Sequence, residues 1–482
     1  MFTTAPLFGK FHSGIKPALR LVRGQPLHHL ESLLADRLAP ALLAPNPGQT
    51  NSRQRDYPPK LTFLAFLDQT LNPAASCRSA VRQIQACHQQ QPHPRDLDDS
   101  TSAYCQSRGR WTLAELVEIR RHLAEHTAGP PLDLGWGTLP PVKLVDGTSL
   151  NLPDTPSNRR DYPQSKDQKP ECGFPLMRLV GVFSLATGAL LERMESPYTT
   201  SENALYQSLW PTFEPGDLVV GDRNFGSWGA IASLQARQVD GLFRLHASRN
   251  ADFRQGRPLG PNDRLITWAK PRNQPVNLTD AAWAALPSTL TVRLVRFRLP
   301  TRRGRTQKIT LATTRLNPLR WPVERLAALY ARRWQIELYF DDLKTTLHMD
   351  MLSCRTPAMI RKELEMHLIA YNLIRSLQGE AAIVCHVPQE RLSFKGCLAT
   401  ACHYSQAIAQ IPASHRKRRR KMYAHMLAVM AADQVPERPD RFEPRCRKRR
   451  PKRYPLMTQP RRVLKAAGVD RLTNSKKKTP LS

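Results

Sequence analysis

The stretch that decides the fold runs from Leu326 to Leu347 and reads LAALYARRWQIELYFDDLKTTL. Its polar residues Tyr330, Arg333, Glu337 and Lys344 are separated by intervals of 3, 4 and 7 residues. An α-helix turns by about 100° per residue, so these four side chains would lie within about 60° of one another. Apolar residues recur beside them and form a second face. The pattern predicts an amphipathic helix that carries a carboxylate, two cations and a phenol along the edge of its buried face.

This predicted helix has an ordinary and a functional interpretation. In the ordinary one, Arg333 and Glu337 form an i,i+4 ion pair on the surface of the helix. In the functional one, the Glu337 carboxylate holds a divalent metal ion and the neighbouring cations bind phosphate oxygens. The helix alone favours the ordinary interpretation, so the rest of the chain has to decide.

The charge of the chain points to a polyanionic partner. In 482 residues, 72 Lys plus Arg stand against 40 Asp plus Glu, a formal charge of +32. Nucleic acid is the first candidate for a surplus of that size. We expect no contact with a membrane, because no run of about 18 apolar residues occurs. The N-terminal stretch lacks the apolar core of a secretory signal, and nine cysteines without a CxxC pair predict reduced thiols in the cytoplasm.

Residues 1–130 are predicted to form a mostly helical N-terminal region. Thr112 followed by Glu115 is a capping-box pattern, which places a helix from Thr112 to about His126. A basic helical module can read the end of a DNA element in a groove. A plain structural role for this region remains equally open.

Residues 141–248 alternate between strand and helix patterns, which predicts an α/β fold. A short apolar run from Val142 leads to Asp146 and an expected turn at Gly147-Thr148, and a second run from Asp217 leads to Asp222. Between them, residues 174–194 read as a β-hairpin, followed by a helix with Ser201 as its cap. Ligand-binding residues of α/β sheets gather at strand ends, so both aspartates are candidate site residues.

Residues 249–318 are predicted to be a β-rich insertion, with strands at 289–299 and 307–314. The helix quoted above begins near Pro322 and, with a further helix at 359–377, completes residues 319–385. The tail, 411–482, has 22 Lys plus Arg against five Asp plus Glu, a net charge of +17. Its basic clusters and repeated prolines predict a flexible segment without long regular structure that binds nucleic acid electrostatically.

Asp146, Asp222 and Glu337 together are more informative than any one of them. An aspartate after a strand is commonly a turn residue or a helix cap. Three carboxylates on rigid elements, however, supply the oxygen ligands that magnesium or manganese requires. Two such ions can activate a water or a 3′-hydroxyl at a phosphodiester bond. This chemistry fits a protein whose charge predicts DNA as its partner.

These residues resemble the DDE transposases of cut-and-paste bacterial insertion sequences, in the group marked by the signature Y-x2-R-x3-E-x6-K. Tyr330, Arg333, Glu337 and Lys344 match the signature at every interval. Asp146-Gly147-Thr148 resembles the first-aspartate motif of that family, and Gly221-Asp222-Arg223-Asn224-Phe225 resembles the second. The resemblance covers about residues 141–380.

The resemblance implies a ribonuclease-H-like catalytic core with a β-strand insertion before Glu337. It implies that Asp146, Asp222 and Glu337 bind two divalent ions, Mg or Mn, and that Tyr330, Arg333 and Lys344 contact the DNA backbone. It also implies a homodimer that pairs terminal inverted repeats, cleaves the double-stranded DNA, in some relatives through a hairpin, and transfers a strand into target DNA in the bacterial cytoplasm, associated with the nucleoid. Some relatives stack a flipped base on an aromatic of the strand before the signature helix, but residues 308–314 contain no aromatic.

Two other functions stay open at this point. A non-catalytic DNA-binding protein derived from such an enzyme would share the sequence pattern. A metal-dependent nuclease that cuts without strand transfer would also share it. The first would be unaffected by Glu337→Gln, and the second would yield no strand-transfer product.

Overall fold

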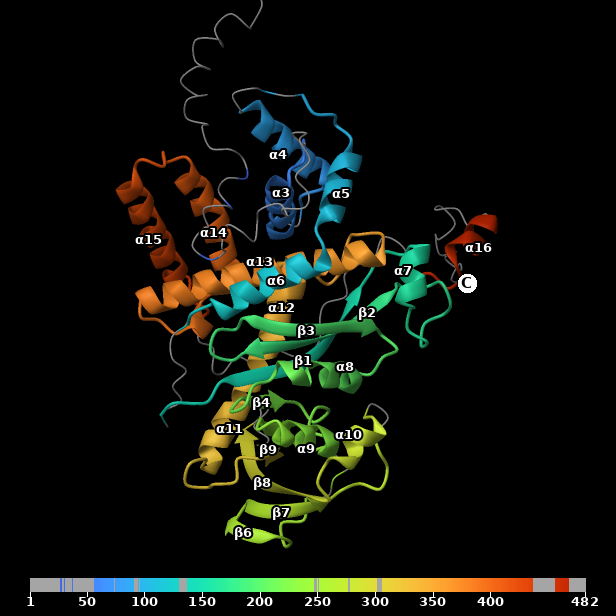
Figure 1. The fold of residues 1–482 in the computed structure, drawn as a ribbon, viewed down its shortest axis with the longest axis vertical. Coiled ribbons are helices and arrows are strands. Elements are labelled where there is room, and N and C mark those ends of the chain that lie inside the picture. The colour runs from blue at the N-terminus through green and yellow to red at the C-terminus, as the bar shows by residue number, and fades with distance from the viewer. Residues whose placement is uncertain are drawn as a thin grey trace, which may run out of the picture.

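The fold is described from a computed structural model. A nine-stranded mixed sheet forms its centre, with helices on both faces (Figure 1). The structure describes residues 27, 30, 37, 56–72, 74–90, 94, 96–129, 137–246, 249, 251–275, 278–300, 306–436 and 456–467.

The first five strands form the half of the sheet that carries both predicted aspartates. They are β1 (Val142–Asn151), β2 (Leu176–Ser184), β3 (Leu190–Pro197), β4 (Leu218–Gly221) and β5 (Asp240–Arg244). β1, β2 and β3 pair antiparallel, whereas β4 runs parallel to β1 and β5 parallel to β4. The β2–β3 pair confirms the predicted hairpin.

The remaining strands extend the same sheet. They are β6 (Arg257–Gly260), β7 (Asp263–Ala269), β8 (Thr289–Pro300) and β9 (Thr306–Thr313). β9 pairs antiparallel with β5, which gives the order β3-β2-β1-β4-β5-β9-β8-β7-β6. The two strands predicted at 289–299 and 307–314 are confirmed, whereas β6 and β7 lie in a polar, Pro- and Gly-bearing stretch to which the sequence assigned no element.

The described part of the N-terminal region is helical. Its helices are α3 (Pro59–Leu71), α4 (Cys77–Gln89), α5 (Thr101–Arg110) and α6 (Leu113–Glu125). At the start of α6 the Thr112 hydroxyl accepts the Glu115 backbone N–H at 3.2 Å, and the Thr112 N–H donates to the Glu115 carboxylate at 2.7 Å. The predicted capping box is confirmed.

Short helices connect the strands. Ser201 caps α8, as predicted, because its hydroxyl accepts the Ala204 N–H at 3.2 Å. The connecting helices are α7 (Pro156–Asp161), α8 (Glu202–Leu209), α9 (Trp228–Ala236) and α10 (Asp280–Ala284).

A 28-residue helix, α13 (Pro357–Val384), crosses the molecule with α6 beside it (Figure 1). The predicted helix at 359–377 is therefore confirmed and is longer than expected. Buried ion pairs tie α13 to α6 and to β3: Arg120 contacts Glu365 at 2.9 Å and Glu192 at 2.5 Å. Because each buried charge has a partner, this network fixes the N-terminal helices on the sheet without an uncompensated charge.

The helix predicted at 326–347 is a chain of different helical turns and not one uniform α-helix. α11 (Val323–Ala331) passes through a 3₁₀ turn (Arg332–Trp334) into α12 (Gln335–Asp341), and a π-helical turn (Asp342–Thr346) ends it. The uniform 100° spacing assumed from the sequence is wrong here, because 3₁₀ and π turns change the angle per residue.

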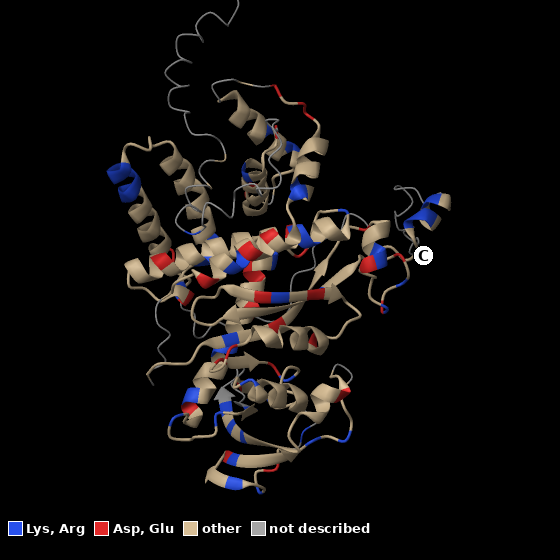
Figure 2. Cartoon of the chain, viewed as in Figure 1, with Lys and Arg blue, Asp and Glu red and all other residues tan. Residues whose placement is uncertain are grey.

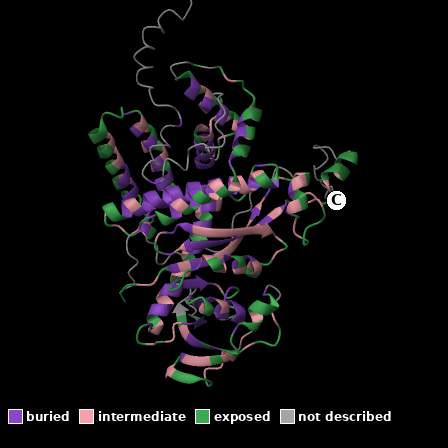
Figure 3. Ribbon diagram, viewed as in Figure 1, coloured by how far each residue is buried: buried purple, intermediate pink, exposed green. Residues whose placement is uncertain are grey.

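The core has two parts, one on each face of the sheet. Figure 3 shows buried residues along α13 and in the strands. Neighbouring residues of β1 alternate between them: Leu144 packs with α11, α12 and α13, and Val145 packs with α8 and α9. This alternation follows from the period of two in a strand. Asp146 has the same parity as Leu144, so its side chain lies on the face that α12 covers.

The C-terminal region is not free of regular structure. α14 (Phe394–Ala409) and α15 (Arg416–Ala432) form a helical hairpin, and α16 (Arg461–Ala466) follows (Figure 2). The prediction of a flexible tail is therefore wrong for residues 416–432. The reason is that Met426, Leu427 and Met430 of α15 are buried, and this packing outweighs the repulsion of its basic start. The clusters at 445–453 and 476–478 lie outside the described residues.

Two further observations concern membranes and cysteines. None of the helices in the described ranges is long and apolar enough to cross a membrane. The eight cysteines among the described residues are free thiols, in agreement with the sequence prediction.

Candidate functional site

Asp146 lies in the middle of β1 and does not end the strand. The expected turn at Gly147-Thr148 is wrong, because β1 continues to Asn151 with β2 as its partner. What ends near Asp146 is the pairing with β4, whose last register pair is Val145 with Gly221. The strand therefore loses its parallel neighbour at Asp146, and this opens the edge of the sheet at that point.

Asp222 directly follows Gly221, so the prediction that it ends a strand is confirmed. Its carboxylate accepts the Asn224 backbone N–H at 2.7 Å, which is the ordinary role of an aspartate in a turn. The parallel register of β1 and β4 nevertheless places Asp222 next to Asp146.

Arg333 joins the signature helix to β1. Its guanidinium lies 3.1 Å from the Glu337 carboxylate and 3.6 Å from the Asp146 carboxylate. The ordinary i,i+4 pair is therefore real, but the same arginine also reaches a strand aspartate. This bridge brings two of the three predicted carboxylates to one place.

The other two signature residues face the same region. The Lys344 ammonium donates to the Thr148 hydroxyl at 3.2 Å, from the π turn to β1. Tyr330 is buried, and burial raises the pKa of its phenol, while the charges of Arg333 and Arg244 lower the pKa and that of Asp222 raises it. All six predicted residues thus converge, although the helix that carries four of them is irregular.

The pKa of Asp146 is raised in the fold. Burial is the main cause, the charges of Asp222 and Glu202 act in the same direction, and the net result is a pKa of about 6. The Gly147 N–H and Arg333 act in the opposite direction. An ionised Asp146 would therefore be stabilised by an additional cation at this place.

Glu202 is a carboxylate that the sequence did not single out. It is the first residue of α8, and its carboxyl group lies against the backbone of Gly147. A Cβ added to Gly147 would meet the Glu202 Oε1 at 2.8 Å. Glycine at 147 therefore makes room for Glu202 and does not form a turn. In the sequence Glu202 looks like an ordinary acid in the first turn of a helix, and its proximity to Asp146 is visible only in the fold.

The residues fit a divalent metal ion in chemistry but are not arranged around one. Among the described residues no group of three or more His, Cys, Asp or Glu is placed to hold a metal. Arg333 lies between Asp146 and Glu337 and neutralises them. Oxygen ligands and an excess of negative charge are what magnesium and manganese require. The buried Arg333 Nε has no hydrogen-bond partner in the described part of the chain.

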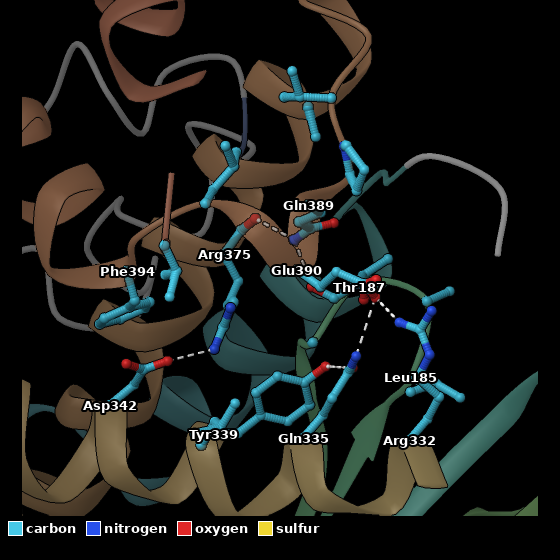
Figure 4. A pocket seen from close by; sticks show the side chains of 18 of the residues that line it. Leu185, Thr187, Arg332, Gln335, Tyr339, Asp342, Arg375, Gln389, Glu390 and Phe394 are labelled. Atoms are coloured by element: carbon cyan, nitrogen blue, oxygen red, sulfur yellow. Dashed lines mark hydrogen bonds and ion pairs between the residues drawn. The ribbon is translucent and has the colours of Figure 1, made fainter. Parts of the chain in front are cut away.

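A cavity of about 760 Å³ lies on the other side of α12 (Figure 4). None of the six predicted residues lines it, and its polar groups bond mainly to one another. Arg375 pairs with Asp342 at 2.6 Å, and Tyr339 donates to Gln335 at 2.7 Å. Since these side chains already bind one another, we interpret the cavity as part of the structural packing behind α12 and not as the functional site.

The family of the chain follows from its match to a known domain. Residues 137–373, which contain all six converging residues, match the family described as the transposase DDE domain. Residues 137–373 are thus a transposase DDE domain. Over 315 residues it is 24% identical to the transposase InsG for insertion sequence element IS4 of Escherichia coli (strain K12), covering 64% of this chain and 68% of InsG.

Two further proteins are similar to this chain, one over a shorter segment and one at lower sequence identity. Another Escherichia coli (strain K12) protein, InsZ, is 28% identical over 151 residues, which is 31% of this chain and 50% of InsZ. A solved structure of a piggyBac transposase synaptic complex with hairpin DNA is similar over 88% of this chain and 86% of that one. Its sequence identity is 10% and its TM-score is 0.40.

Proposed function

We propose that this chain is a DNA transposase that cleaves transposon ends with divalent metal ions and transfers the freed strand into target DNA. The observation that carries the proposal is the Arg333 bridge. One guanidinium reaches Asp146 at 3.6 Å and Glu337 at 3.1 Å, next to Asp222, inside a transposase DDE domain. The stability of the fold does not require that three carboxylates from separate elements lie together beside Arg333, whose buried Nε has no partner among the described residues.

The order of the first five strands supports a ribonuclease-H-like core. Three antiparallel strands are followed by two parallel ones in the order β3-β2-β1-β4-β5. Asp146 lies on β1, Asp222 directly follows β4, and Glu337 lies on α12, which contacts β1. The strands β6 to β9 would then be the insertion between Asp222 and Glu337.

Asp146, Asp222 and Glu337 would hold two divalent ions, magnesium or manganese. Such ions lower the pKa of a bound water or hydroxyl and stabilise charge on phosphodiester oxygens. Arg333 contacts both Asp146 and Glu337 and so holds the two carboxylates close to each other. Lys344 and Arg333 would bind backbone phosphates beside the cleaved end, and Tyr330 would close the wall of the site.

The partners that follow are double-stranded DNA, both as terminal inverted repeats and as target, and a second copy of the chain in a homodimer that pairs two ends. The net charge of +32 supports binding to DNA. We propose that the protein acts in the bacterial cytoplasm on the nucleoid.

Two alternatives remain distinct from this proposal. A non-catalytic DNA-binding descendant would bind ends without cutting them. A nuclease would cut but give no strand-transfer product. A cleavage assay and a strand-transfer assay on the same labelled duplex separate the three.

The test is Asp146→Asn, assayed with a duplex that carries the ends of the element and with magnesium. We expect cleavage to be lost while end binding persists, since the substitution removes a metal ligand but keeps its shape. Asp167→Asn, which changes an exposed loop aspartate, is the matched control and should cleave normally. Cleavage by Asp146→Asn at the rate of the control would refute the proposal.

A further inference from the structure

The free end of the α14–α15 hairpin carries six cations in a row. Residues 416–421 read RKRRRK, and α15 begins with them. Five of the six side chains are exposed, and Arg419 is half-buried. We call residues 416–421 the basic collar, because six successive residues of a helix point in all directions around its axis.

The hairpin holds the basic collar out into solvent. The buried residues of α15, Met426, Leu427, Met430 and Ala431, all lie in its second half, which packs on α13 and α14. The first turns of α15 therefore project beyond the packed base, and Figure 2 shows them as a blue tip. α13 lies between this tip and the sheet (Figure 1).

Among the residues that the structure describes, no acid neutralises the basic collar. The sequence contains no Asp or Glu between Glu390 and Asp433. Within the described part of the chain, none of the six side chains forms an ion pair with an acid.

The basic collar destabilises the first turns of α15 when no partner is bound. Cations at the start of a helix oppose its dipole. Like charges at i,i+3 and i,i+4, such as Arg416 with Arg419 and with Arg420, add repulsion. A polyanion would relieve both effects, so this concentration of charge is explained by a bound partner better than by solubility.

We propose that the basic collar binds the phosphate backbone of duplex DNA without reading its sequence, away from the carboxylate site. Duplex DNA presents one negative charge per about 1.7 Å of axis, a density that matches consecutive cations. The collar contains only Lys and Arg, so its contacts position the DNA and carry no base information. The choice of DNA as partner rests on the proposed function; the surface itself does not.

The surroundings of the basic collar argue against an anionic membrane. Membrane-binding helices pair a basic face with exposed large apolar side chains. The exposed large hydrophobic residues of the described chain all lie outside residues 394–432. An acidic protein could neutralise the charge of the basic collar. It does not present negative charges at the close, regular spacing of duplex DNA, so we favour the duplex.

The test compares the full-length protein with the variant Arg416→Gln/Arg418→Gln/Arg420→Gln/Lys421→Gln. Binding to a random-sequence duplex is measured by fluorescence anisotropy in chelator at several salt concentrations. We expect the affinity to fall about tenfold or more, and the slope of log affinity against log salt to become shallower by up to about 3.6, or about 0.9 for each lost phosphate contact. The triple variant Arg416→Lys/Arg418→Lys/Arg420→Lys keeps the charge and should bind like the wild type.

The outcomes separate a lost contact from a lost fold. Removing like charges should leave the melting temperature unchanged or raise it, so weak binding with an intact melting curve supports the proposal. Wild-type affinity and slope in the quadruple variant would overturn it. So would a variant that keeps its affinity for the duplex and loses only that for anionic phospholipid vesicles. The proposed function fails in a different assay: cleavage retained by Asp146→Asn refutes it and leaves the binding result standing.

Discussion

Two arginines on opposite sides of the same helix differ in how completely their hydrogen bonds are satisfied. Behind α12, Arg375 donates to Tyr371 at 2.9 Å, to Gln378 at 2.9 Å and to Asp342 at 2.6 Å. In front of α12, Arg333 has two looser carboxylate contacts, at 3.1 Å and 3.6 Å, and a buried Nε without a partner among the described residues.

The difference distinguishes a structural network from one that is ready for a ligand. A closed network rigidifies the fold and has nothing left to bind. An open network keeps donor and acceptor capacity, which is costly to bury unless a ligand uses it. Substitutions in the Arg333 network, in front of α12, should therefore change catalysis and binding. Substitutions in the Arg375 network, behind α12, should change stability.

The largest expected effect concerns the front. Glu337→Gln should lower magnesium-dependent cleavage by more than about a hundredfold. Loss of a residue that only hydrogen-bonds to a metal ligand already costs up to about a hundredfold, and loss of a ligand itself should cost more. Cleavage is measured on a labelled duplex under single-turnover conditions. Asp341→Asn, on the same helix and exposed, is the control and should keep full activity. Equal rates for both variants would show that the front carboxylate has no catalytic role.

The second prediction concerns the back. Arg375→Met should lower the free energy of unfolding by about 3–5 kcal/mol, because it removes a buried guanidinium that pairs with Asp342 at 2.6 Å and donates to Tyr371 and Gln378. Arg333→Met should cost less, about 1 kcal/mol, since its carboxylate contacts are longer, at 3.1 Å and 3.6 Å, and Glu337 is 46% exposed to water. Urea denaturation of both variants measures the difference. Similar losses for the two arginines would contradict the distinction between the networks.

The third prediction is a pH dependence at the front. The pKa of Asp146 is raised to about 6 in the folded chain, so its neutral form is favoured there. The stability that this gives is complete below the ordinary aspartate pKa of about 4 and is lost as the pH rises through 6. In chelator, Asp146→Asn should therefore be more stable than the wild type at pH 8, by about 1–3 kcal/mol.

The greater stability of Asp146→Asn should disappear as the pH is lowered. The melting temperatures of Asp146→Asn and the wild type should converge between pH 6 and about pH 4. The exposed-loop variant Asp167→Asn should show no such trend. A wild type as stable as Asp146→Asn at pH 8 would mean that the fold does not disfavour the ionised Asp146 carboxylate.

The parts of this site that the sequence could predict have local causes. The capping box of Thr112 with Glu115 and the Ser201 cap depend on residues three apart, and the structure contains both. Asp222 follows a short buried run and ends it. The four signature residues face one region, although the uniform helix that their intervals predict is not formed.

The parts that the sequence missed depend on distant residues or on packing. Gly147 looked like a turn residue because the reason for it, Glu202, lies 55 positions later and meets it only in the fold. The π turn around Lys344 has no marker in the sequence. From the sequence the start of α15 reads as a flexible tail, because its charge hides the apolar second half that anchors it.

The smallest expected effect separates a phosphate contact from a structural one. Lys344 donates to Thr148 at 3.2 Å, a partly buried bond worth about 1 kcal/mol if it only supports the fold. If Lys344 instead binds a phosphate, Lys344→Gln should weaken duplex binding a few-fold and reduce the salt slope by about 0.9. Arg237→Gln, an exposed cation after α9, is the control for general charge loss. A lower melting temperature with an unchanged salt slope would show that Lys344 supports the fold, as Arg375 does, and does not bind a phosphate.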